Sequence, residues 1–232
     1  MFSSLRRTVS NITSKLSEQY CSHVLGIYSQ YGEDIVLDRL LKSPREGFYV
    51  DIGANDPVKF SNTLRFYNRG WRGVNIEPNP KKYNDICLAR PADVNLNVGV
   101  GVDAGVLPFY IIDPDTLSTF DRRVADTALS DGFRLSRTID IQVVCLEKVL
   151  AEHGNGGRID FMSIDVEGAE IQVLRSNDWR RYRPRLILIE VNRAEIEIEG
   201  FLSEIDYIDI YSNGTNKIYA DSRWNLSRVF SE

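Results

Sequence analysis

The stretch GFYVDIGANDPVKFSNTL, residues 47–64, passes from an apolar segment through a short polar loop into a helical pattern. The apolar segment predicts a buried strand, and Ser61 is a good N-cap for the helix that follows. Gly53 lets the backbone approach a ligand closely, and Asn55 tolerates unusual dihedral angles. The loop lacks the third glycine of a dinucleotide fingerprint and the lysine of a P-loop, so we expect a strand–loop–helix unit for a different ligand.

Apolar runs alternate with helical patterns along the rest of the chain. Strand-like runs occur at residues 48–53, 73–77, 94–100, 107–112, 141–145, 159–165 and 185–191, and helical patterns at 30–42, 61–69, 79–89, 167–177 and 195–205. Strands separated by helices predict an α/β fold with a mostly parallel sheet covered by helices on both faces. Two alternating runs around Asn213-Gly214 predict a C-terminal antiparallel hairpin.

Composition indicates an ordinary globular protein. The chain has 232 residues, of which 43% are hydrophobic and 26% charged. Its net charge of -5 argues mildly against a nucleic-acid partner, and no run of 18 apolar residues predicts a membrane span. The three cysteines have no metal-like spacing, and Cys87 and Cys145 stand in apolar runs. We therefore expect buried thiols and a cytoplasmic location.

The first 26 residues form an N-terminal helical extension in this interpretation, and residues 27–232 form a single domain. Large apolar residues recur in the extension at helical spacing: Phe2, Leu5, Val9, Ile12 and Leu16. We expect this helix to pack on the domain or on a second copy of the chain, which predicts a homo-oligomer. Weak peripheral association with a membrane is the alternative.

Ligands of open parallel sheets bind beyond the carboxyl ends of the strands. Asp51 at the end of the first strand would repel a phosphate but suits an ammonium group. Glu77 ends the second strand, where an acid accepts both ribose hydroxyls, although a solvated loop acid is the alternative. Asn97 and Val98, with small residues after them, leave room for an adenine ring. An ammonium group, a ribose and an adenine together describe S-adenosylmethionine.

Acidic residues also end the next two buried strands. Asp165 and Glu167 stand in IDFMSIDVEGAE, and Glu190 and Asn192 stand in RPRLILIEVN. For Glu167, capping of the next helix is the alternative. Acids at the ends of buried strands are costly without a partner, so they predict a ligand, a metal ion or a proton-transfer role.

These motifs, in this order, resemble the FkbM-type methyltransferases over about residues 27–192. The similar segments are YSQYGEDIVLDRLL, GFYVDIGAND, FSNTLRFYNRGWRGVNIEPNP, ARPADVNLNVGVG, LSTF, IDFMSIDVEGAEIQVLR and RPRLILIEVN. The resemblance implies a class I methyltransferase fold, Rossmann-like, with a seven-stranded sheet. It also implies methyl transfer from S-adenosylmethionine to an oxygen, commonly on sugars of glycans, lipopolysaccharides or natural products.

The resemblance also assigns residues. It places Asp51, Gly53 and Asn55 at the methionine part of the cofactor, Glu77 at the ribose, and Asn97 with Val98 at the adenine. Gln30 would cover the cofactor from the N-terminal side, and Asp165 would lie beside it. Pro57 and Lys59 occupy a stretch that often carries a glycine or histidine in relatives. We expect the acceptor to contact Lys59, Asn62, Thr63, Ser118 and Thr119.

A sugar hydroxyl needs a base or a metal ion to lose its proton. His23 and His153 are the two histidines, and neither is well placed in the sequence. Asp165, Glu190 and Asn192 offer three oxygen ligands that suit Mg²⁺ or Mn²⁺, with Asp165 and Glu190 as the catalytic groups. A metal-free site with Asp165 as base is the alternative. A non-catalytic cofactor-binding scaffold and an NAD-dependent oxidoreductase are the rival functions.

Overall fold

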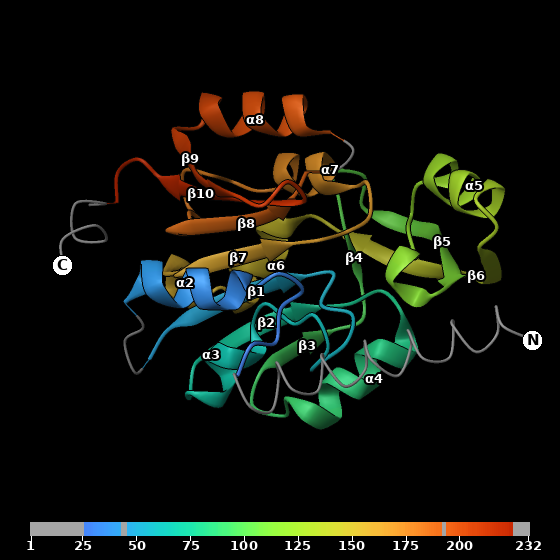
Figure 1. Cartoon of the computed structure of the whole chain (residues 1–232), viewed down its shortest axis with the longest axis horizontal. Helices are drawn as coiled ribbons and strands as arrows, with labels where there is room; N and C mark the ends of the chain where they lie inside the picture. Colours follow the sequence, from blue (N-terminus) through green and yellow to red (C-terminus); the bar gives the residue numbers. More distant parts are fainter. Residues whose placement is uncertain (1–25, 43–45, 192–193, 225–232) are drawn as a thin grey trace, which may run out of the picture.

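The computed structural model describes residues 26–42, 46–191 and 194–224. The expected N-terminal helix, with His23, and Asn192 lie outside the described residues. Figure 1 shows a central twisted sheet between helices, and a smaller group of strands beside it. Within the part of the chain that the structure describes, no helix combines the length and the apolar character that crossing a bilayer requires.

The main sheet has seven strands in the order β3-β2-β1-β7-β8-β10-β9. Their bounds are β1 Phe48–Ile52, β2 Arg72–Ile76, β3 Val94–Leu96, β7 Phe161–Ile164, β8 Leu186–Glu190, β9 Tyr207–Ser212 and β10 Asn216–Asp221. β10 runs antiparallel to β8 and β9, and the other neighbouring strands are parallel. This arrangement confirms the predicted class I methyltransferase fold and the C-terminal hairpin.

Alternating side chains of the strands divide the core between the two faces of the sheet. Tyr49 and Phe161 face one side, where they pack with Leu37 of α2 (Glu33–Leu41) and Phe66 of α3 (Leu64–Asn68). Val50 and its neighbours face the other side. There they pack with α6 (Leu146–His153), α7 (Glu170–Arg175) and α8 (Glu195–Glu204). The burial of both faces explains why these strands read as continuous apolar runs.

A second, three-stranded sheet has the order β4-β6-β5, which differs from the prediction. The strand expected at 94–100 is divided between β3 and β4 (Gly99–Val100), which belong to different sheets. The strands expected at 107–112 and 141–145 are β5 (Gly105–Asp113) and β6 (Arg134–Val144), which pair with each other along nine positions. The antiparallel pair that these two strands form has its own small hydrophobic core around Phe109 and Ile141.

Two helices, α5 (Arg122–Ser130) and α6, were not predicted from the sequence. α5 joins the long strands β5 and β6 and buries only Ala125 and Ala128, so its apolar stripe is narrow. α6 leads into β7 through the short turn η3 (Asn155–Gly157). A further turn, η2 (Asp115–Leu117), follows β5. Asn79 is the N-cap of α4 (Pro80–Ala89), and its side chain accepts a hydrogen bond from the amide of Lys81. α4 and η2 flank the carboxyl ends of the main sheet.

Candidate active site

A cleft of about 600 Å³ opens beyond the carboxyl ends of β1, β2, β7 and β8. It lies at the switch point of the sheet, where β1 is flanked by β2 on one side and by β7 on the other. Its size suits a small-molecule ligand. Seven of the eight residues predicted for the cofactor line it: Gln30, Asp51, Gly53, Asn55, Glu77, Val98 and Asp165.

The loop after β1 is held against the end of β7. Gly53 has φ +83°, and a Cβ atom at this position would lie 1.7 Å from the carbonyl oxygen of Asp165. Only glycine tolerates both the dihedral angle and this contact. The amide of Gly53 donates to the carbonyl of Ile76, so the loop joins the ends of β1, β2 and β7. The backbone at Gly53 therefore forms the floor of the cleft.

Asp51 lines the cleft but is only 5% exposed, and its carboxylate is paired with groups inside the protein. Thr63 Oγ1 donates to Asp51 Oδ2 over 2.6 Å, and Arg90 Nη1 donates to Thr63 Oγ1 over 2.5 Å. Arg90 is 2% exposed. Its other nitrogen, Nη2, donates to Ser61 Oγ and to the carbonyl of Pro57. Burial raises the pKa of Asp51, while the Thr63 hydrogen bond and the Arg90 charge oppose that shift.

Arg90 is a functional candidate that the sequence analysis missed. It stands at the end of α4 in LARPAD, which overlaps a segment that resembles the family, but the resemblance assigned it no role. Its guanidinium reaches back to the loop after β1 and supplies the positive charge that buried Asp51 requires. A charged residue that precedes a proline after an amphipathic helix was the only available signal.

Glu77 is 4% exposed and receives two backbone hydrogen bonds. The amide of Asn55 donates to Oε2 over 2.8 Å, and the amide of Asn79 donates to Oε1 over 2.7 Å. Burial raises the pKa of Glu77 to about 7, although both hydrogen bonds and the charge of Lys82 favour the ionised form. Each carboxylate oxygen retains a second lone pair for a ligand hydroxyl.

Asn97 does not take the adenine-contacting position that was predicted for it. Its amide nitrogen donates to the backbone carbonyls of Glu77 and Pro78, at 2.8 and 3.0 Å, so the side chain lies behind the wall of the cleft. These bonds turn the chain at the end of β3 and fix the end of β2. Val98 lines the cleft as expected.

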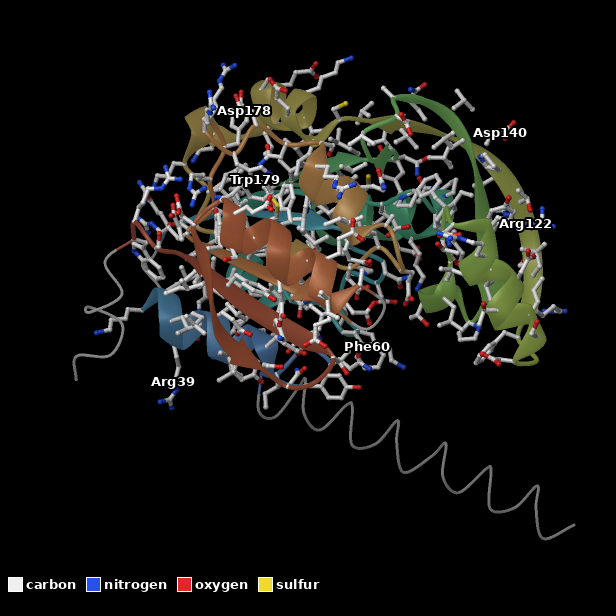
Figure 2. The ribbon with its side chains drawn as sticks, turned by 90° about the horizontal axis from the view of Figure 1, so that it is seen from above. Arg39, Phe60, Arg122, Asp140, Asp178 and Trp179 are labelled. Carbon is white, nitrogen blue, oxygen red and sulfur yellow. The ribbon has the colours of Figure 1, made fainter. Side chains whose placement is uncertain are left out.

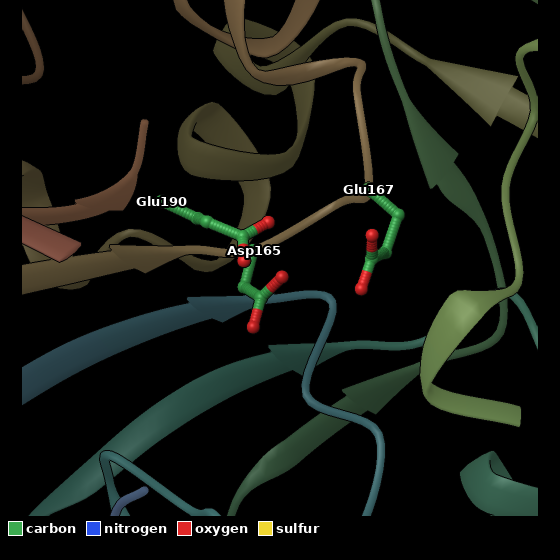
Figure 3. Close-up of side chains that lie close together, drawn as sticks. All are labelled: Asp165, Glu167 and Glu190. Carbon is green, nitrogen blue, oxygen red and sulfur yellow. The ribbon is translucent and has the colours of Figure 1, made fainter. Parts of the chain in front are cut away.

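Three carboxylates gather at the ends of β7 and β8. One oxygen each from Asp165, Glu167 and Glu190 lies within 4.8 Å of the other two, and Figure 3 shows Asp165 between its neighbours. The side chain of Asp165 is exposed to solvent at the cleft. Its pKa lies well above the usual range because the protein desolvates the carboxylate and because Glu190 and Glu170 add negative charge.

Glu167 joins this cluster through an unusual backbone conformation. β7 ends at Ile164, and Glu167 has φ +53°. Asp165 and Glu167 therefore both lie beyond the extended strand, and the turn brings their carboxylates together. Glu167 does not cap the next helix, because α7 begins at Glu170. Glu170 holds the turn instead by accepting hydrogen bonds from the amides of Val166 and Gly168.

The residues predicted for the acceptor divide into two groups. Lys59, Asn62 and Ser118 line the cleft. Thr63 and Thr119 are fully enclosed, so the prediction that they contact the acceptor is wrong. Thr63 bonds to Asp51, and Thr119 Oγ1 donates to the carbonyl of Glu167 over 2.9 Å. Thr63 therefore positions the carboxylate of Asp51, and Thr119 fixes the backbone of Glu167.

An ion pair crosses one side of the cleft. Lys82 Nζ lies 3.2 Å from Asp56 Oδ2 and 3.3 Å from Asp115 Oδ2. It therefore connects the loop after β1 to the turn η2 beside the second sheet. His153 lies at the last turn of α6, before β7, and so at the opposite end of the sheet from the cleft. Among the described residues that line the cleft, carboxylates are the groups available to accept a proton.

A family model described as "Methyltransferase FkbM domain" matches residues 51–214 of the chain. No curated protein matches the chain significantly. Among solved structures, a TehB-like SAM-dependent methyltransferase from Corynebacterium glutamicum is 8% identical with a TM-score of 0.45, over 91% of this chain and 99% of that one.

Two further solved structures are similar at the same level. The 1,6-didemethyltoxoflavin-N1-methyltransferase of Burkholderia thailandensis is 10% identical with a TM-score of 0.46, over 94% of this chain and 90% of that one. The precorrin-6y C5,15-methyltransferase of Geobacter metallireducens is 14% identical with a TM-score of 0.43, over 82% and 87%. Identities this low carry no information about the acceptor.

Proposed function

The chain belongs to the FkbM methyltransferase family, and on that premise we propose that it transfers the methyl group of S-adenosylmethionine to a sugar hydroxyl. The observation that carries the proposal is the position of Glu77 and of the carboxylate cluster of Asp165, Glu167 and Glu190 on one cleft. The acceptor would be a glycan, a lipopolysaccharide or a glycosylated metabolite.

The residues that line the cleft suit S-adenosylmethionine. Glu77 would accept hydrogen bonds from the ribose hydroxyls through the lone pairs that the Asn55 and Asn79 amides leave open. The backbone floor at Gly53 and the side chain of Gln30 would contact the methionine part, and Val98 would lie against the adenine. The negative charge of Asp51 and Asp165 complements a ligand that carries an ammonium and a sulfonium.

S-adenosylmethionine supplies an electrophilic methyl group on a positively charged sulfur. In the proposed transfer, the acceptor oxygen forms a bond to the methyl carbon while the S–CH₃ bond breaks, and its electron pair stays on sulfur. The protein aligns the hydroxyl and removes its proton. Asp165 is the group that we assign to the proton, because its raised pKa makes it a stronger base than an ordinary aspartate.

A divalent cation at the same cluster remains part of the proposal. Mg²⁺ and Mn²⁺ prefer oxygen ligands, and Asp165, Glu167 and Glu190 present three carboxylate oxygens within 4.8 Å of one another. The sequence predicted Asp165 and Glu190 as metal ligands. Glu167 is a third candidate ligand, which the folded chain brings next to them. A cation there would lower the pKa of the acceptor hydroxyl and neutralise the mutual repulsion of the carboxylates.

Two measurements test the function. Calorimetry should detect binding of S-adenosylmethionine and S-adenosylhomocysteine, and a methyl-transfer assay over nucleotide sugars and isolated glycans should identify an acceptor. Binding of both cofactors without transfer to any acceptor class would favour the non-catalytic scaffold. Binding of NAD in place of both would overturn the proposal and favour an oxidoreductase.

A further inference from the structure

The turn at residues 56–60 is fixed from several directions. Asp56 Oδ1 accepts hydrogen bonds from the amides of Val58 and Lys59, at 3.0 and 2.9 Å. The buried Arg90 holds the carbonyl of Pro57 over 2.8 Å from behind. On the cleft side, Lys82 pairs with Asp56. The end of this turn is therefore a rigid part of the cleft rim.

Phe60 stands at the end of this turn in an unfavourable backbone conformation. Its φ is +59°, in the left-handed region that glycine adopts without strain and that bulky side chains rarely adopt. The next residue, Ser61, is fixed by its bonds to Arg90 and to the amides at the start of α3. The chain therefore has little freedom to relieve the strain at Phe60.

The side chain of Phe60 does not reach the buried core. It is 38% exposed and lines the cleft, and Figure 2 shows it at the edge of the molecule, away from the core around Trp179. Residues held in strained dihedral angles by the surrounding structure cluster at ligand-binding sites. An aromatic ring that is both strained and exposed at the rim of a cleft points to a ligand that covers it.

We propose that Phe60 is the residue that selects the acceptor, by stacking against the apolar C–H face of a pyranose ring. This inference rests on the proposed function, because the acceptor must reach the methyl group inside the cleft. Sugar rings present an apolar C–H face and a polar edge, and an aromatic side chain beside polar residues matches both. Asn62 and Ser118, which line the same cleft, are suited to the hydroxyls at the ring edge.

Lys59 supports the orientation of the ring. Its ammonium lies 4.7 Å from the centroid of Phe60, on one face of the ring. Tyr31, 55% exposed, also lines the cleft and adds a second aromatic side chain to the rim. The acceptor would stack on the Phe60 face that Lys59 leaves open. Neither Phe60 nor Tyr31 takes part in the transfer itself.

The decisive variant is Phe60→Gly, because it separates binding from folding. Glycine removes the strain at φ +59°, so thermal stability should be equal to or above that of the wild type. S-adenosylhomocysteine affinity, measured by calorimetry, should be unchanged. The affinity for a pyranose should fall about tenfold, which is the size of one lost aromatic contact. Phe60→Tyr retains the ring and should bind the pyranose like the wild type.

The probes are methyl α-D-glucopyranoside, methyl α-D-mannopyranoside and methyl α-L-rhamnopyranoside, measured by saturation-transfer NMR on the protein bound to S-adenosylhomocysteine. We expect at least one to receive saturation from aromatic protons in the wild type, in Phe60→Tyr and in the control Val58→Ala, and a several-fold weaker effect in Phe60→Gly, where Tyr31 is still present. Val58 is an exposed apolar residue of the same turn, 45% exposed.

The outcomes separate the two proposals. If the protein fails to bind S-adenosylhomocysteine, the proposed function itself is wrong. If it binds that ligand but no glycoside receives saturation, or if Phe60→Gly binds a glycoside as well as the wild type does, the stacking role is overturned. A parallel loss of S-adenosylhomocysteine affinity in Phe60→Gly would also overturn it, because Phe60 would then contact the cofactor.

Discussion

Thr63 donates its hydroxyl hydrogen to Asp51 over 2.6 Å, although twelve positions separate the two residues in the chain. Because the same hydroxyl oxygen accepts a hydrogen bond from Arg90, it connects a buried carboxylate to a buried guanidinium. The charge that the first strand presents to the cleft is therefore set by a residue at the end of α4.

Arg90→Met should destabilise the protein by about 3 kcal/mol, because it leaves the buried carboxylate of Asp51 without its balancing charge. Urea denaturation at neutral pH measures this loss. The pKa of Asp51 is already raised by burial, and loss of the Arg90 charge would raise it further. The difference between variant and wild type should therefore shrink as the pH falls and Asp51 becomes neutral in both.

Arg90→Lys is the matched variant for that experiment. It keeps the charge but cannot bridge Thr63, Ser61 and Pro57 at once. We expect Arg90→Lys to be more stable than Arg90→Met but less stable than the wild type. Its affinity for S-adenosylhomocysteine should stay close to that of Arg90→Met. Equal stability of Arg90→Met and the wild type would show that Asp51 needs no counter-charge.

Gly53→Ala should disrupt the cleft floor, since its Cβ atom would lie 1.7 Å from the carbonyl oxygen of Asp165 at φ +83°. The combined strain and displacement should cost about 2 kcal/mol or more, measured by thermal denaturation, and should weaken S-adenosylhomocysteine binding. Gly200→Ala, in α8 with open space around its Cβ position, is the control and should be neutral or slightly stabilising. A stable Gly53→Ala protein with normal affinity contradicts the proposed floor.

S-adenosylhomocysteine affinity should rise between pH 6 and pH 8, because the pKa of Glu77 is about 7 and its ionised form is the better acceptor for ribose hydroxyls. Stability of the ligand-free protein should change in the opposite direction. The folded state binds the Glu77 proton more tightly than the unfolded state, so this contribution is lost as the pH rises from about 4.5 to about 7.

Glu77→Gln should abolish both pH dependences and lower the affinity by about 1.5–3 kcal/mol, the usual loss of a hydrogen bond to a charged group. Calorimetry over the pH series measures the affinity. Glu152→Gln, an exposed residue of α6, is the control and should retain the slope of the wild type. An affinity independent of pH in the wild type would remove Glu77 from the ribose site.

Asp165→Asn should abolish methyl transfer while it retains S-adenosylhomocysteine binding, because the amide cannot accept the hydroxyl proton. Asp140→Asn, exposed on the second sheet as Figure 2 shows, should be fully active. Removal of divalent cations with EDTA decides the role of a metal ion. Activity lost in EDTA and restored by Mg²⁺ or Mn²⁺ supports a cation at the cluster, and activity retained in EDTA makes Asp165 the base. An active Asp165→Asn enzyme would refute both roles.

Local patterns in the sequence predict the main sheet and most of the residues that line the cleft. Each buried parallel strand reads as an apolar run ending in a small or acidic residue, because such strands are covered on both faces and meet the ligand at their carboxyl ends. Asp51, Gly53, Glu77, Asp165 and Glu190 were located in this way, and all line the cleft. Local patterns are enough to predict these strands and the residues at their ends, because both depend on burial of consecutive residues along the chain.

The second sheet and the hydrogen-bond partners of the buried polar side chains depend on contacts between segments that are distant in the chain. β4, β5 and β6 pair in a sheet of their own after the chain leaves β3, and no periodicity in the sequence records this division. Thr63 and Thr119 looked like free hydroxyls, yet folding encloses them beneath the carboxylates. Arg90 and Phe60 lie inside segments that resemble the family, yet no local pattern assigned either residue a role. Their importance arises from contacts between distant segments and from one strained dihedral angle, and these exist only once the chain has folded.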